Sequence, residues 1–71
     1  MKDHKVVIAA DATRVSTEYA LKMGISEDEA LRIFLGSDTY RTLIDTETGL
    51  CYEVFEYVYD MFLEEMGEAV E

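Results

Sequence analysis

Apolar residues recur along this chain at the spacing of an amphipathic α-helix. In the first segment Ile8, Ala12, Val15, Tyr19 and Met23 follow one another at intervals of four, three, four and four residues. This spacing places them on one helical face. We therefore predict a first helix over residues 3–23. Because residues 5–9 are rich in β-branched side chains, a short strand there is the alternative.

Capping residues predict two further helices. Ser26 stands three positions before Glu29 and is followed by an apolar run, which is the pattern of a capping box. It predicts a helix over residues 26–35, ending at Gly36, where a left-handed residue is commonly needed. Ser37 or Asp38 can then cap a third, shorter helix over residues 37–44.

The turn-forming residues 45–49 leave two interpretations of the last apolar segment. A helix over residues 50–66 is preferred, because its period continues for four turns. The alternative is a hairpin with strands over residues 39–44 and 50–55, which Tyr, Thr, Val and Phe favour. The predicted fold class is all-α, a small bundle of about four helices in one domain of residues 1–71. The alternative is α+β, with a β-hairpin over residues 39–55.

Charge is distributed unevenly along the chain. All six basic residues lie in the first 41 positions, whereas the last 30 residues hold nine acidic residues and no Lys or Arg. A net charge of −10 argues against direct binding to nucleic acid or to anionic membranes. Because 49% of the residues are hydrophobic, the acidic half is not expected to be a disordered tail.

As a helix, residues 50–66 would combine an acidic stripe with a wide apolar arc. The stripe contains Glu53, Glu56, Asp60 and Glu64. The arc spans roughly 240° at 100° per residue, whereas a surface helix needs somewhat over 100°. We expect one side to enter the core and the other flank to meet a partner, since Tyr and Met are common at interfaces. That flank contains Tyr52, Tyr59, Leu63 and Met66. The alternative is a central helix of the bundle.

The leading functional interpretation is a non-enzymatic protein–protein interaction module that self-associates through this flank. A core of this size supplies only about 3–5 kcal/mol, and oligomerisation commonly adds the remainder. A homo-oligomer, most simply a dimer, is expected. The alternative is an acidic inhibitor, antitoxin-like or DNA-mimic protein, which would dock on a basic protein through the acidic stripe.

Residues suited to catalysis or metal binding are few. The chain has one histidine, His4, and one cysteine, Cys51, so neither a Cys–His pair nor a His-bearing zinc site is expected. Cys51 lies on the apolar arc and is expected in the core. Asp45, Glu47 and Gly49 resemble the start of a calcium loop but lack its closing glutamate. We predict no enzymatic activity, no cofactor and no metal. Without a signal-peptide pattern or a membrane span, and with a single cysteine, a cytoplasmic location is expected.

Four short motifs follow one another within about residues 18–66. They are Gly24-Ile-Ser-Glu-Asp-Glu-Ala-Leu31, Thr39-Tyr-Arg-Thr-Leu43, Asp45-Thr-Glu-Thr-Gly-Leu50 and Glu56-Tyr-Val-Tyr-Asp-Met-Phe62. The set resembles a group of short uncharacterised bacterial helical proteins that form a domain of unknown function. The resemblance implies a small stand-alone helical domain. It carries over no activity and no functional residue.

Overall fold

The computed structural model describes residues 4–68, and every regular element in that range is helical. The elements are α1 (His4–Met23), α2 (Glu27–Leu35), α3 (Asp38–Ile44), the 3-10 helices η1 (Thr46–Thr48) and η2 (Leu50–Tyr52), and α4 (Phe55–Met66). The all-α prediction is confirmed. Residues 4–68 contain no strand, so the alternatives with strands at residues 5–9 and 39–55 are wrong. Asp3, the first residue of the first predicted helix, lies outside the described residues.

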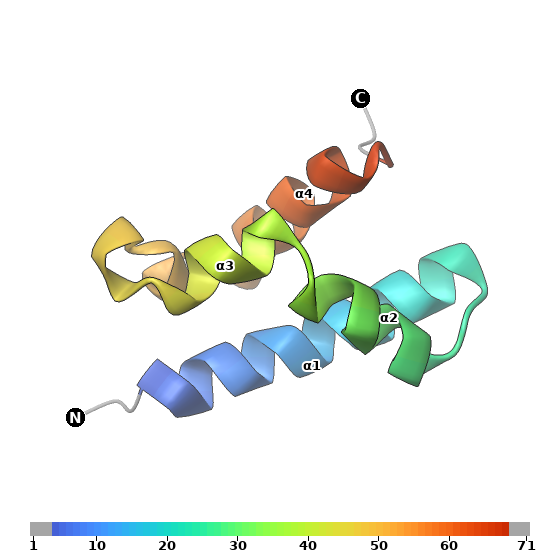
Figure 1. Cartoon of the computed structure of the whole chain (residues 1–71), viewed down its shortest axis with the longest axis horizontal. Coiled ribbons are helices and arrows are strands. Elements are labelled where there is room, and N and C mark those ends of the chain that lie inside the picture. The colour runs from blue at the N-terminus through green and yellow to red at the C-terminus, as the bar shows by residue number, and fades with distance from the viewer. Residues whose placement is uncertain (1–3, 69–71) are drawn as a thin grey trace.

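Two helical hairpins make up the bundle (Figure 1). The helix α1 runs along the length of the molecule, and α2 folds back over its C-terminal half. Gly24 has φ +70°, a left-handed conformation that glycine adopts without steric cost, and its amide donates to the Ala20 carbonyl. The helices α3 and α4 form the second hairpin, joined by η1 and η2.

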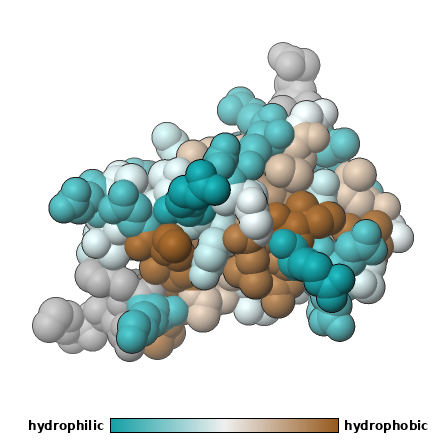
Figure 2. Space-filling view, in the orientation of Figure 1, coloured by the Kyte–Doolittle hydropathy of each residue, from teal (hydrophilic) through white to brown (hydrophobic). Residues whose placement is uncertain are grey.

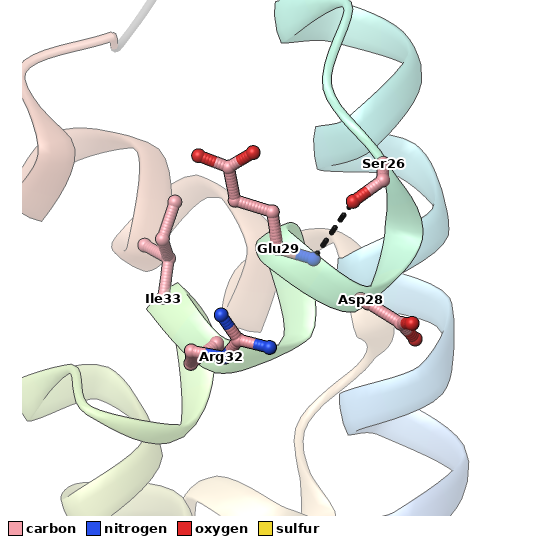
Figure 3. A pocket seen from close by; sticks show the side chains of 5 residues that line it. All are labelled: Ser26, Asp28, Glu29, Arg32 and Ile33. Atoms are coloured by element: carbon pink, nitrogen blue, oxygen red, sulfur yellow. Dashed lines mark hydrogen bonds between the residues drawn. The ribbon is translucent and has the colours of Figure 1, made fainter.

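Serine side chains begin α2 and α3 as the sequence predicts. The Ser26 hydroxyl accepts from the Glu29 amide at 3.1 Å (Figure 3), and the Ser37 hydroxyl accepts from the Tyr40 amide at 3.1 Å. Figure 3 also shows the Glu29 carboxylate pointing away from Ser26, so only half of the capping box is formed. The serine bond alone satisfies one of the free amides at the start of α2.

Aromatic rings from three helices meet at the centre of the core. The ring of Phe62 in α4 lies edge-to-face against Phe34 of α2, with centroids 5.0 Å apart, and against Tyr19 of α1 at 4.9 Å. Phe34 and Phe62 are fully buried, as are Val15, Leu43 and Val58. Edge-to-face packing is a preferred arrangement for such rings and adds to the burial of their area. The core therefore joins both hairpins.

The prediction of one helix over residues 50–66 is wrong for its first five residues. Gly49 is left-handed at φ +76°, and Leu50–Tyr52 form a single 3-10 turn that buries Leu50 and Cys51. The backbone is then extended at Glu53 and Val54, and α4 begins at Phe55. The apolar period continues across this break because both pieces contribute side chains to one core. The prediction that Cys51 lies in the core is confirmed, although Cys51 belongs to η2.

A carboxylate on α4 completes the start of α3. Glu65 accepts hydrogen bonds from the Asp38 amide at 2.7 Å, from the Thr39 amide at 2.8 Å and from the Thr39 hydroxyl at 2.8 Å. Burial alone would raise the pKa of Glu65, but these hydrogen bonds and the positive charge of Arg41 outweigh it and hold the pKa below its ordinary value of 4.5. Glu65 therefore links α4 to the N-terminus of α3, where the helix dipole favours a negative charge.

Candidate functional site

The outer face of α4 carries the acidic stripe. Glu56, Asp60 and Glu64 recur every fourth residue, which places them along one side of the helix, and all three are exposed. Glu53 is also exposed, but it lies on the extended segment before α4. The prediction that Glu53 shares the helical stripe is therefore wrong, because the helix starts two residues later.

A shallow hollow of about 330 Å³ lies beside this stripe and is lined by Tyr57, Asp60, Met61 and Glu64. Tyr57 is 56% exposed, and Met61 is half-buried against the core. Two carboxylates, an aromatic face and a flexible thioether thus border one concave surface. A cationic side chain with an apolar stem suits such a surface, because carboxylates attract its charge and the ring and thioether contact its stem.

The four residues predicted to form an oligomer interface do not share one exposed flank. Leu63 is buried at 7% exposure, and Tyr59 and Met66 pack partly buried against the core. Tyr52 is 65% exposed, but it belongs to η2 and not to α4. The grouping of these four residues on one helix is therefore corrected, and the monomer itself uses most of their apolar area.

Packing of α1 explains why this flank is covered. The Arg14 guanidinium lies over the Phe55 ring at 4.1 Å from its centroid, and Phe55 stacks on Tyr59 with centroids 5.5 Å apart. Burial raises the pKa of the Tyr59 hydroxyl, and the charges of Glu18 and other neighbours add to the shift. This contact was not predicted from the sequence, because Arg14 and Phe55 lie 41 residues apart in the chain.

Apolar side chains that the sequence analysis did not single out as a binding surface remain exposed elsewhere. Leu21 and Val6 on α1 are 77% and 64% exposed, and Val54 and Ile44 are also exposed. Figure 2 shows apolar surface interrupted by hydrophilic side chains on the face where α1, α2 and α3 meet. Between α1 and α3 lies a groove of about 320 Å³, lined by Lys5, Ile8, Ala9, Ala12, Tyr40 and Ile44.

A further hollow of about 420 Å³ lies at the start of α2 and is lined by Ser26, Asp28, Glu29, Arg32 and Ile33 (Figure 3). The N-terminus of a helix attracts anions, but here Glu27, Asp28 and Glu29 already place carboxylates at that end. These acidic side chains stabilise the helix and repel an anionic ligand. We therefore assign the hollow no binding role.

Among residues 4–68, one carboxylate oxygen is buried without a hydrogen-bond partner. The Oδ2 atom of Asp11 is buried and has no hydrogen-bond partner among the described residues. Burial raises the pKa of Asp11, and the nearby charge of Arg14 only partly opposes the shift. Within residues 4–68, no three His, Cys, Asp or Glu side chains lie close enough together to hold a metal ion. Asp11 is therefore a source of local instability in this fold.

No helix among the described residues combines the length and apolarity that a membrane crossing requires. Comparison with known proteins gives no relative: no protein-family model, curated protein or solved structure matches this chain.

Proposed function

We propose that this protein is a protein–protein interaction module whose acidic face on α4 binds a basic protein segment. The observation that carries the proposal is the arrangement of Glu56, Asp60 and Glu64, exposed on one side of α4 next to Tyr57 and Met61. No basic residue follows Arg41, so nothing along the chain after that position neutralises this face. Complementary charge increases the association rate and selects among partners.

The spacing of the charges on α4 suits binding to a basic protein segment better than it suits imitation of DNA at a DNA-binding site. Carboxylates four residues apart on a helix are separated by about 6 Å along its axis. Duplex DNA carries a negative charge about every 3.4 Å of its axis along one strand, and about every 1.7 Å when both strands are counted. The stripe is therefore a poor substitute for DNA, but its spacing matches a partner helix with basic residues at every fourth position. Tyr57 and Met61 supply the apolar contact that such an amphipathic helix needs.

The experiment uses a fluorescent, Arg- and Lys-rich amphipathic helical peptide as the probe, with a scrambled peptide of the same composition beside it. Fluorescence anisotropy at low and moderate salt measures the affinity of both. We expect tighter binding of the amphipathic peptide and a loss of affinity with salt, because exposed charges are screened within about 10 Å at 0.1 M. Equal binding of the two peptides would contradict the proposal.

Charge reversal locates the binding face. Asp60→Lys should weaken binding about two- to thirtyfold, because it replaces one surface attraction with a repulsion. Glu47→Lys makes the same change of net charge on η1, outside the proposed face, and is the matched control. An equal loss in both variants would mean that only net charge matters, and the α4 face would not be the binding surface.

A further inference from the structure

The hollow on α4 brings one aromatic ring and two carboxylates together on a single face of the helix. It is lined by residues at positions i, i+3, i+4 and i+7, which are Tyr57, Asp60, Met61 and Glu64, and this spacing places them side by side. All of them are exposed except Met61, which is half-buried. A cation in the hollow therefore meets negative charge and the face of a ring at the same time.

The monomer itself does not use these groups. Among residues 4–68, neither Asp60 nor Glu64 forms an ion pair. In the same range, the Tyr57 ring stacks on no other ring and on no guanidinium. All six basic residues lie in the first 41 positions of the chain, so no basic neighbour in α4 neutralises the hollow. Its ring and its carboxylates are therefore available to a cationic group of another protein.

The side of α4 that faces α1 already holds an arginine by the same combination of groups. The Arg14 guanidinium lies over the Phe55 ring, 4.1 Å from its centroid. A carboxylate is also close, because the charge of Arg14 opposes the upward shift that burial gives the pKa of Asp11. A guanidinium thus lies between a ring and a carboxylate within this fold. The hollow repeats that combination on the outer face of α4, with one ring and two carboxylates.

Arginine suits a ring beside carboxylates better than lysine does. A guanidinium is planar, so its face can lie on the ring while its N–H groups donate to carboxylates at its edge. It is also more weakly hydrated than an ammonium, so contact with the ring costs it less hydration. A lysine ammonium is attracted by the same carboxylates, but it is a compact and strongly hydrated point charge. The ring is therefore the group in the hollow that distinguishes the two side chains.

We propose that the hollow holds one arginine side chain of the basic partner, with its guanidinium stacked on Tyr57 and donating to Asp60 and Glu64. Met61 contacts the methylene stem of that arginine. Tyr57 then gives the site a preference for arginine over lysine. This preference rests on the proposed function, because it specifies which basic residue the acidic face of α4 binds.

Two amphipathic helical peptides test the preference, one with Arg and the other with Lys at every basic position. The peptides are otherwise identical, so they carry the same net charge. Fluorescence anisotropy at one salt concentration measures the affinity of the protein for each. We expect the Arg peptide to bind about two- to fivefold more tightly, which is the effect of one exposed cation–π contact.

Tyrosine substitutions separate the contribution of the ring from that of charge. Tyr57→Leu keeps the charge and an apolar side chain but removes the ring, so the ratio of the two affinities should fall towards one. Tyr57→Phe retains the ring and should retain the preference. Tyr52→Leu changes another exposed tyrosine, on η2 and outside the hollow, and is the matched control that should also retain it. Circular dichroism should show wild-type helicity for all three variants, because both tyrosines are exposed.

The possible results separate this preference from the proposed function. Binding of neither peptide would overturn the proposed function and the arginine site with it. Equal binding of both peptides to the wild type would overturn the preference for arginine alone, and the binding of a basic segment would stand. A preference that survives Tyr57→Leu, or that Tyr52→Leu abolishes equally, would overturn the role of Tyr57.

Discussion

Replacing Glu65 with alanine should be among the most destabilising changes at any surface position of this protein. The substitution removes all three hydrogen bonds that the carboxylate accepts from Asp38 and Thr39. Asp38 is exposed and can bond to water, but Thr39 is 1% exposed and its amide would lose its partner. We expect a loss of about 2–3 kcal/mol, against a total of about 4–10 kcal/mol for a chain of this length.

Urea unfolding followed by circular dichroism at neutral pH measures this loss. The adjacent variant Glu64→Ala is the matched control, because Glu64 lies on the outer stripe of α4, and its effect should stay within about 0.5 kcal/mol. Glu65→Gln keeps one acceptor oxygen, so its loss in the free energy of unfolding should lie between those of Glu65→Ala and Glu64→Ala. Equal effects of Glu65→Ala and Glu64→Ala would refute the reasoning.

The same interaction should make stability fall in acid. Because the folded-state pKa of Glu65 lies below its ordinary value of 4.5, its contribution is complete above that pH and is lost as the pH falls through the lowered value. The difference between the wild type and Glu65→Ala should therefore be constant from neutral pH to about pH 5 and shrink below it. A difference that does not change down to pH 2 would show that the carboxylate is not the stabilising group.

Two further substitutions test the interior of the bundle. Asp11→Ala should raise the free energy of unfolding at neutral pH by about 1 kcal/mol, since it removes a buried oxygen without a hydrogen-bond partner. Because burial raises the pKa of Asp11, the gain should disappear in acid, where Asp11 is protonated. A loss of stability at pH 7, measured by urea unfolding, would contradict this prediction. Phe34→Ala should lower the free energy of unfolding by about 3–5 kcal/mol and leave much of the chain unfolded. The control Phe34→Leu should retain the helical circular dichroism. A cooperative unfolding transition near the wild-type midpoint for Phe34→Ala would refute the central role of this ring.

The first three helices could be predicted from the sequence because their signals are local. Serine caps at Ser26 and Ser37 and the spacing of apolar residues define the limits of α2 and α3 to within one residue, and the predicted end of the first helix at Met23 is that of α1. The start of α4 could not be placed in this way. The N-cap position is Val54, which has no side-chain acceptor, and the apolar period continues across the break. The apolar period indicates which residues enter the core, and here two separate elements, η2 and α4, supply them.

The candidate surfaces were predicted less well than the fold, because the exposure of each side chain depends on which other helices pack against it. The exposure of Glu56, Asp60 and Glu64 follows from their spacing alone. The burial of Leu63 does not, because it depends on how α1 and α4 pack. The role of Glu65 was also missed, since its partners lie 26 and 27 residues earlier in the chain. An acidic residue within an apolar arc can be a cap for another helix.

The bond between Glu65 and the start of α3 has a consequence for how the protein forms during synthesis. The first hairpin, α1 and α2, contains its own turn and capping residues, but its core side chains Tyr19 and Phe34 pack against Phe62 of α4. The helix α3 has only seven residues, too few to be stable alone, and one of its caps is not translated until residue 65. Both halves of the bundle therefore depend on side chains of α4, and the complete core must wait until almost all of α4 has been synthesised.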